Sequence, residues 1–467
     1  MNFNEIHLEI LHRLQPHLKD LYFSANEVMP PLWSDRYAEA NKLLCLQEIN
    51  DENEDTIKNI QRGLLSKLLK DALQNVPFYK KNVNLDPDNI NPNNAIESLF
   101  EFPLISKRDI MNNPTEFISK KFNKYFLIHI TSGGSTGRGV GLWKTINEIH
   151  AEHAFIDDIW ATLGCDKKAK ILRLGADAIV PVDQYPCQIK RRRLFVSPRH
   201  LNENWLPRII NEIEDFHPDF IHSYPSCLEI LARYLKDNNR NLKVKGILLA
   251  SEEVRPEQLD FFKEVFNAPI CFFYGAAEQV LLGYGCYDGK NISYHFNPLF
   301  GFVENFKDEY GQELVGTSLW NYAMPLIRYR TEDYGEVKEG ITNCGVCGRS
   351  LKTVQHLDGR KQYYLTTKYG TTFPGLNVSI DYFIWDYVSS FQFVQNKPGD
   401  IELHIVPKDN FTEEVEMQIL EAQKKRLSDW FESIQIIKET EIPLTKAGKR
   451  RLVVVNEISN TLPGQSR

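Results

Sequence analysis

The sequence has few cysteines, no long apolar run and no large excess of charge of either sign. Its 467 residues include 8 cysteines, too few in a chain of this length for a disulfide framework, so we expect a reducing, cytoplasmic setting. No segment approaches the roughly 18 uninterrupted apolar residues that a membrane span needs. The first twenty residues contain acidic side chains with helical spacing, which argues against a secretory signal. The net charge of −7 gives no support to nucleic acid or an anionic membrane as a partner.

What the sequence does contain is an alternation of strand-like and helix-like segments. The runs "AKILRLGA", "DFIHSYP", "KVKGILLAS" and "PICFFYG" are short and β-rich, and helical patterns such as "SCLEILARYLKDN" and "RPEQLDFFKEVFN" lie between several of them. Such alternation predicts an α/β architecture with substantial parallel sheet. The first hundred residues are mainly helical in pattern, with Ile57, Ile60, Leu64, Leu65, Leu68 and Leu69 on one face of a predicted helix.

The composition changes near residue 357, and this predicts two domains. Residues 1–357 are expected to form a large N-terminal domain of mixed sheets and helices. Residues 358–467 are expected to form a small C-terminal α/β domain. We expect a monomer or a homodimer.

The segment "ITSGGSTGRGVGLWKT" (130–145) is rich in glycine, serine and threonine. It is not a Walker A motif, because Gly137 is followed by Arg138 and because "VGLWKT" is typical of a second strand. A helix is predicted to begin only later, where Thr145 and Glu148 form a capping box. A glycine loop between strands can direct backbone N–H groups and hydroxyls at an anion such as phosphate; a plain turn is the alternative.

Four further stretches contain candidate site residues. "FFYGAAEQ" contains Glu278, a candidate ligand of Mg²⁺; "PLIRYRTEDYGEV" presents Arg328, Arg330 and Asp333; "HLDGRKQYY" contains Arg360; and "PLTKAGKRRLVVVN" presents Lys449 on a glycine-bearing loop. In this order the motifs resemble the adenylate-forming superfamily of acyl-CoA synthetases, luciferases and peptide-synthetase adenylation domains. The resemblance spans roughly residues 65–455 and points to the branch of the phenylacetate–coenzyme A ligases and their relatives in capsular polysaccharide biosynthesis.

The resemblance implies the adenylate-forming enzyme fold, in which residues 1–357 would bind the nucleotide and the carboxylate and residues 358–467 would form a mobile lid domain. It also implies two half-reactions. ATP would activate a small-molecule carboxylic acid as an acyl-adenylate, and a thiol, expected to be that of coenzyme A, would then take the acyl group. By the same resemblance Lys449 and Glu278 would be catalytic, with Lys449 bridging the carboxylate and the α-phosphate and Glu278 holding Mg²⁺. The nucleotide-binding residues would be Thr131, Ser132, Gly133, Gly134, Ser135, Thr136 and Gly137 at the phosphates, Tyr274 and Gly275 near the adenine, and Asp333 and Arg360 at the ribose.

The chain departs from the superfamily pattern after the GR pair, where Lys361 and Gln362 stand at the expected hinge. Two alternatives to the acid–thiol ligase therefore stay open. One is an acyl- or aminoacyl-transferring ligase that serves a carrier protein or a sugar amine in surface-polysaccharide assembly. The other is a non-catalytic descendant that binds a nucleotide.

A metal site is also predicted. "NCGVCGR" supplies Cys344 and Cys347, a spacing that directs two sulfurs toward one tetrahedral ion; two buried structural cysteines are the alternative. Some members of the resembled branch also have a Cys and a His in the upstream region, where this chain has Cys286 and His295. We expect a structural Cys₃His zinc site, with His356 as the rival fourth ligand.

Overall fold

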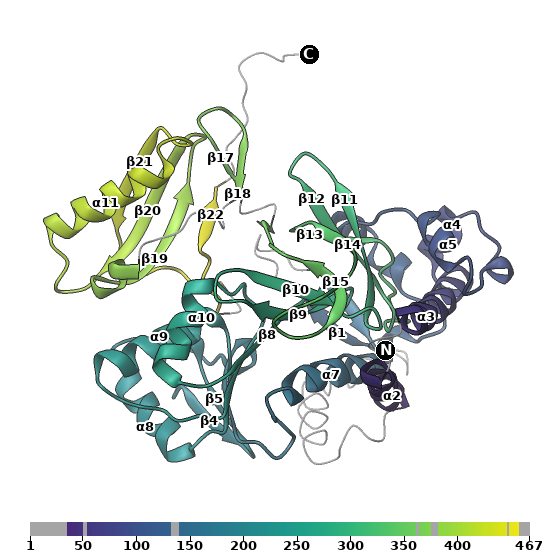
Figure 1. Cartoon of the computed structure of the whole chain (residues 1–467), viewed down its shortest axis with the longest axis horizontal. Coiled ribbons are helices and arrows are strands. Elements are labelled where there is room, and N and C mark those ends of the chain that lie inside the picture. Colours follow the sequence, from purple (N-terminus) through teal and green to yellow (C-terminus); the bar gives the residue numbers. More distant parts are fainter. Residues whose placement is uncertain are drawn as a thin grey trace, which may run out of the picture.

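The computed structural model describes residues 35–49, 54–131, 140–360, 364–374, 382–445 and 448–456. Figure 1 shows a large body with a smaller C-terminal lobe beside it. The α/β class and the division into a large N-terminal and a small C-terminal domain are therefore confirmed. The exact boundary after residue 357 stays a prediction. Of the expected phosphate loop, Ser132, Gly133, Gly134, Ser135, Thr136 and Gly137 lie outside the described residues.

A layer of helices forms the N-terminal part. These helices are α2 (Asp35–Ile49), α3 (Glu54–Asn75), α4 (Pro77–Asn82), α5 (Ala95–Phe100) and α6 (Lys107–Asn112). The apolar face predicted for α3 is buried, with Leu65, Leu68 and Leu69 at 0% exposure. Pro77 opens α4, because a first helical turn needs no N–H from its leading residue.

A ten-stranded sheet forms the centre of the large domain, in the order β14-β15-β10-β9-β8-β7-β6-β3-β5-β4. Its parallel strands are β3 (Ile171–Leu174), β5 (Arg193–Val196), β6 (Phe220–Ser223), β7 (Gly246–Leu249) and β8 (Ile270–Gly275). The strands that join antiparallel are β4 (Cys187–Lys190), β9 (Leu282–Tyr287), β10 (Ile292–Phe296), β14 (Val337–Asn343) and β15 (Ser350–Val354).

Three helices connect parallel strands, and helices cover the sheet (Figure 1). The connecting helices are α8 (Leu206–Phe216), α9 (Pro225–Asp237) and α10 (Pro256–Phe266), whereas α7 (Ile146–Ala161) links β2 (Gly141–Lys144) to β3. Helix α9 buries Leu228, Leu231 and Leu235 against the sheet, as its helical spacing requires. Its first residues, Pro225 and Ser226, follow the carboxyl end of β6, and this end of the strands is where open α/β sheets bind ligands.

Two smaller sheets position further residues. The first has the order β11-β12-β13-β16 and consists of β11 (Gly301–Lys307), β12 (Gln312–Ser318), β13 (Tyr329–Tyr334) and β16 (Gly359–Arg360). The second pairs β1 (Ile128–Thr131) with β2 (Gly141–Lys144). The glycine-rich segment therefore connects two antiparallel strands, as predicted. The capping box of Thr145 and Glu148 is also present at the start of α7.

The C-terminal lobe has its own sheet and its own core. Its sheet has the order β21-β20-β19-β22 and consists of β19 (Val388–Gln395), β20 (Asp400–Pro407), β21 (Ser433–Lys438) and β22 (Val453–Val455). Helix α11 (Glu413–Leu427) packs on this sheet. A hairpin of β17 (Tyr364–Thr366) and β18 (Thr372–Pro374) lies beside it. Its apolar cluster runs from Leu365 to Val453 and includes Phe393 and Phe431. A separate core is what allows a lobe to move as a unit.

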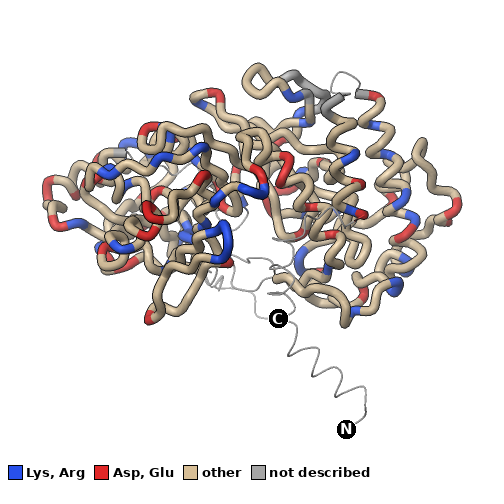
Figure 2. The backbone as a smooth tube through the Cα atoms, turned by 90° about the horizontal axis from the view of Figure 1, so that it is seen from below, with Lys and Arg blue, Asp and Glu red and all other residues tan. Residues whose placement is uncertain are grey.

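Among the described residues, no helix is long and apolar enough to cross a membrane. Figure 2 shows acidic and basic residues interspersed over the lower face of the molecule.

Candidate active site

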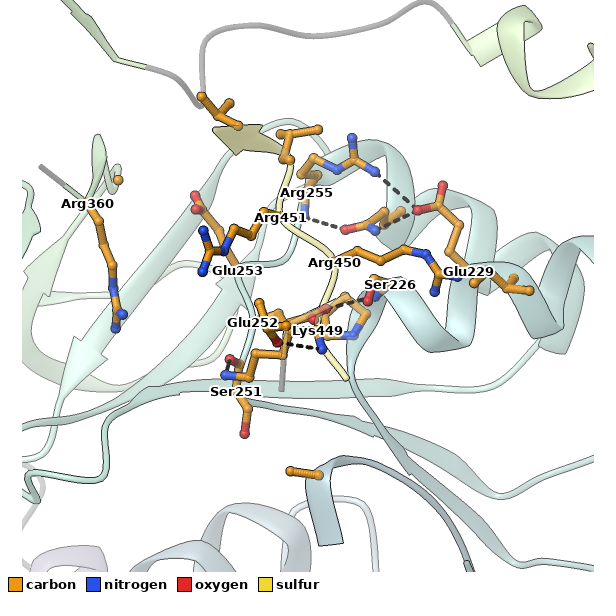
Figure 3. A pocket seen from close by; sticks show the side chains of 18 of the residues that line it. Ser226, Glu229, Ser251, Glu252, Glu253, Arg255, Arg360, Lys449, Arg450 and Arg451 are labelled. Atoms are coloured by element: carbon orange, nitrogen blue, oxygen red, sulfur yellow. Dashed lines mark hydrogen bonds and ion pairs between the residues drawn. The ribbon is translucent and has the colours of Figure 1, made fainter. Parts of the chain in front are cut away.

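A cavity of about 930 Å³ lies where the two domains meet, at the carboxyl ends of the parallel strands. Several residues predicted from sequence line it together, although they are far apart in the chain. They are Thr131, Tyr274, Gly275, Asp333, Arg360 and Lys449. Figure 3 shows the side of the cavity near Lys449. The described residues of this group therefore lie around one cavity.

Asp333 is held by two neighbours. The pairing of β13 with β16 places it opposite Arg360, whose Nε donates to Asp333 Oδ1 at 2.8 Å. The hydroxyl of Tyr274 donates to Asp333 Oδ2 at 2.7 Å. Burial and the nearby charge of Asp333 raise the pKa of Tyr274 well above its ordinary value, so this phenol remains a hydrogen-bond donor. The carboxylate of Asp333 is fixed in orientation and could accept further hydrogen bonds from a diol.

The two arginines of the "PLIRYRTEDYGEV" segment have structural partners. Arg328 forms an ion pair with Glu304 at 2.8 Å, and Arg330 contacts Asp308 and Glu313. These pairs tie β11, β12 and β13 together, which leaves Asp333 as the residue of this segment that lines the cavity.

Lys449 reaches the large domain from a tight turn of the C-terminal lobe. In this turn the Lys449 backbone N–H donates to Thr445 Oγ1 at 3.0 Å, and Gly448 has a φ of +71° that favours glycine. The Lys449 Nζ donates to the backbone oxygen of Ser251 at 2.5 Å and lies 5.3 Å from the ring centroid of Tyr224. Burial lowers the pKa of the Lys449 ammonium, while the charge of Glu252 opposes that shift.

Glu278 lies close to the cavity residues in sequence but is oriented by other groups. It accepts a 3.3 Å hydrogen bond from the hydroxyl of Tyr329. The next residue, Gln279, has a φ of +59°, and its side chain donates to Glu152 at 2.6 Å. Glu152 also lies 3.6 Å from the fully buried Lys144 ammonium. Glu278 is therefore a carboxylate on a fixed backbone, which suits a ligand of a hard cation such as Mg²⁺.

Acidic and polar residues that follow β6 and β7 were not predicted from the sequence. Glu252 and Glu253 follow β7, Ser226 and Glu229 belong to α9, and all four line the cavity. Burial raises the pKa of the Glu252 carboxyl, which accepts a 3.1 Å hydrogen bond from the Ser226 N–H. The signal that could have found them is their position, because residues after parallel strands gather at the ligand edge of a sheet.

The predicted metal ligands come together at another edge of the sheet. The ligand atoms of Cys286, His295, Cys344 and Cys347 all lie within 4.8 Å of one another, and the Cys286 and Cys344 sulfurs are 3.6 Å apart. Two thiolates on one tetrahedral zinc ion would lie about 3.8 Å apart, given a Zn–S distance near 2.3 Å. His356 is not in this cluster; its side chain is 67% exposed and lies 3.7 Å from Asp358.

The hydrogen bonds of His295 fit a metal ligand. The Thr353 hydroxyl donates to the Leu351 oxygen at 2.9 Å, so it accepts at 2.8 Å from Nδ1–H of His295. This leaves Nε2 with a free lone pair, and Nε2 is buried with no hydrogen-bond partner among the described residues. A second ring nitrogen fixed by a hydroxyl is the usual support for a metal-bound histidine. The four residues therefore fit a closed zinc site.

Known proteins share both the sequence and the fold of this chain. A family model described as the CapK C-terminal domain matches residues 371–456. Protein CapK of Staphylococcus aureus is 25% identical over 400 residues, which cover 81% of this chain and 86% of that protein. The phenylacetate-coenzyme A ligase of Escherichia coli (strain K12) is 24% identical over 362 residues, which cover 70% of this chain and 77% of that protein.

One similar solved structure is that of 2-hydroxyisobutyryl-CoA ligase in the postadenylation state with 2-HIB-AMP. It superposes on this chain with a TM-score of 0.63 at 14% sequence identity, and the match covers 85% of this chain and 89% of that one. The chain thus has the fold of the adenylate-forming CoA ligases and has CapK and phenylacetate–coenzyme A ligases as its relatives in sequence, which confirms the superfamily and the branch indicated by its motifs.

Proposed function

We propose that this protein is an ATP-dependent, AMP-forming ligase that joins a small carboxylic acid to a thiol, with coenzyme A as the first candidate acceptor. One observation is the main support for the proposal. A lysine of the small domain enters the cavity that also contains the Asp333–Arg360 pair and Thr131. A cation at this position can act on charge that develops between an acid and a nucleotide phosphate.

In the first half-reaction a carboxylate oxygen of the acid forms a bond to the α-phosphorus of ATP. The bond from that phosphorus to the bridging oxygen breaks, and pyrophosphate leaves with the electron pair. Because negative charge gathers on the phosphate oxygens, a positioned ammonium such as Lys449 would stabilise the transition state. Thr131 and the glycine-rich residues after it would donate hydrogen bonds to the phosphates.

The nucleoside would be held at the opposite side of the cavity. Asp333 would accept hydrogen bonds from the ribose hydroxyls, Arg360 would lie beside the ribose and phosphates, and Tyr274 with Gly275 would contact the adenine. Glu278 would supply one oxygen ligand to Mg²⁺, an ion that neutralises phosphate charge when it is bound.

In the second half-reaction the thiol sulfur bonds to the acyl carbon, the thiol proton is released, and AMP leaves with its oxygen. The acceptor is the open part of the proposal. The similarity to CapK favours the alternative that a carrier protein or a sugar amine takes the acyl group in surface-polysaccharide assembly.

We also assign a structural role to the Cys₃His cluster. Zinc bound by Cys286, His295, Cys344 and Cys347 would join β9, β10 and the segment between β14 and β15. Four protein ligands leave no position for a water molecule, so the site would stabilise the fold without taking part in the reaction.

The experiment is ATP–pyrophosphate exchange across a panel of aryl, fatty and amino acids, followed by transfer to coenzyme A, a carrier protein or an amine. Acid-dependent exchange is the expected result. If AMP binds but no acid supports exchange, the chain is a non-catalytic nucleotide-binding protein and the proposal is wrong.

A further inference from the structure

A group of arginines lines the cavity on the side away from Asp333. Arg233 lies on α9, Arg255 precedes α10, and Arg450 follows Lys449 in the small domain; all three line the cavity. Figure 3 shows Arg255 and Arg450 on the same side as Glu229, whereas Arg451 points the other way, toward Glu253. We call Arg233, Arg255 and Arg450 the arginine subsite.

Two of these arginines share one carboxylate. Glu229, only 5% exposed, accepts from Arg233 at 2.8 Å, from Arg255 at 3.2 Å and from the Gln258 amide at 2.9 Å. Although burial works against ionisation, the two arginines lower the pKa of Glu229. Its oxygens are therefore occupied, and it cannot also pair fully with Arg450.

Arg450 has two guanidinium nitrogens without a hydrogen-bond partner among the described residues. These two nitrogens, Nε and Nη1, are buried. A guanidinium keeps its charge at any physiological pH, so it cannot escape this cost by losing a proton. Buried N–H donors without acceptors destabilise the protein, and the cost is larger on a charged group.

The surrounding carboxyl groups do not cancel the charge of the subsite. Glu252 and Glu253 also line the cavity, and burial raises the pKa of both carboxyl groups toward the neutral form. Even if Glu229 and Glu252 are both ionised, they face Arg233, Arg255, Arg450 and Lys449, so cations remain in excess. A ligand with an anionic group would remove that excess and supply the missing acceptors.

We infer that the arginine subsite binds a second anionic group, a phosphate or a carboxylate, carried by the ligand whose reacting end meets Lys449. The inference rests on the proposed function and adds a substrate class to it. Two ligands could carry that group: the acid, if it is a dicarboxylate or a phosphorylated acid, or the thiol acceptor, if it carries a phosphate as phosphopantetheine does. The Nε–H and Nη1–H groups of Arg450 point in different directions, so each would donate to its own oxygen of the bound ligand, and charge-assisted hydrogen bonds of this kind to phosphate or carboxylate are strong.

The test uses calorimetric binding to the full chain with AMP present, so that it needs no turnover. One arm compares 4′-phosphopantetheine with pantetheine, and the other compares glutarate with pentanoate. In at least one arm we expect the anionic member to bind at least about 10-fold more tightly than its partner. Arg450→Met should abolish that preference, Arg450→Lys should restore part of it, and Lys425→Met, which removes an exposed cation of α11, should leave it unchanged. The responding arm identifies which ligand carries the group.

The inference is overturned if neither arm shows a preference for the anionic member, or if Arg450→Met keeps the preference of the wild type. A failure of AMP to bind would instead count against the proposed function. Unchanged AMP affinity and unchanged thermal unfolding in Arg450→Met would show that the variant is folded and that the lost preference is specific.

Discussion

The ammonium group of Lys449 lies 2.5 Å from the backbone oxygen of Ser251, which precedes it by 198 residues in the chain. This contact joins the small domain to the residues that follow β7 in the central sheet. It places a cation at the edge of the cavity where ligands of α/β proteins bind.

Replacing Lys449 by alanine should lower ATP–pyrophosphate exchange by about 10²–10³-fold, because a single oriented electrostatic contact in a transition state is worth that much. Lys425→Ala, at an exposed position of the same domain, should leave exchange unchanged. Near-normal exchange in Lys449→Ala would remove this residue from the proposed mechanism.

Replacing Gly448 by alanine should lower exchange through the turn that presents Lys449. Its φ is +71°, and an added Cβ would lie 3.0 Å from Ile179 and 3.1 Å from Pro198 in the large domain. A left-handed conformation costs an ordinary residue about 1–2 kcal/mol, so we expect roughly a 5–30-fold loss of closed, active protein. Gly370→Ala is the matched control, since Gly370 has a φ of +74° and no atom near its Cβ position. Equal losses in the two variants would show that strain within the small domain, and not contact with the large domain, is responsible.

Asp333→Asn should weaken AMP binding by roughly 10–150-fold, the value of a hydrogen bond to a charged group. Isothermal titration calorimetry of AMP measures the change directly. Tyr274→Phe removes one donor to the Asp333 carboxylate but keeps the ring and the charge, so its effect should be much smaller. If both variants bind AMP like the wild type, Asp333 does not contact the ribose.

Glu278→Gln should raise the Mg²⁺ concentration that gives half-maximal exchange, because an amide oxygen is a weaker ligand of Mg²⁺ than a carboxylate. Tyr329→Phe removes only the 3.3 Å hydrogen bond to Glu278 and serves as the control. An unchanged Mg²⁺ dependence in Glu278→Gln would exclude it as a ligand of the ion.

Protein purified without added metal should contain about one zinc per chain by ICP-MS, as a closed four-ligand site requires. Cys347→Ser should lose the metal and unfold at a lower temperature. Thr353→Val keeps every ligand but removes the hydroxyl that fixes His295, and should weaken zinc binding by about 10–100-fold. Wild-type protein without stoichiometric zinc would refute the site.

Local patterns in the sequence were sufficient for many elements. The capping box of Thr145 and Glu148, the buried leucine face of α3 and the strands β3, β6, β7 and β8 were all predicted from spacing and composition. These features depend on neighbours a few residues apart, which a single sequence displays. The charged residues at the carboxyl ends of β6 and β7 were missed, because the order of strands in a sheet is not written in their local sequence.

The metal cluster shows the same limit. The spacing of Cys344 and Cys347 predicted a pair of ligands, but the choice between His295 and His356 depended on which strand lies beside them. Pairing of β10 with β9 and β15 brings His295 and Cys286 to the cysteine pair. His356 follows β15 and points to solvent near Asp358.

The sequence by itself determined the helices, the strands, the order of the motifs and the types of residue offered to a nucleotide and a metal, because these follow from local spacing and side-chain chemistry. Only the tertiary structure decided that Tyr274, Asp333 and Arg360 form one hydrogen-bonded group and that Lys449 reaches Ser251. It also left Arg450 buried beside a carboxylate that is already paired. Such contacts join residues that are far apart in the chain, and they arise from the packing of whole sheets and domains.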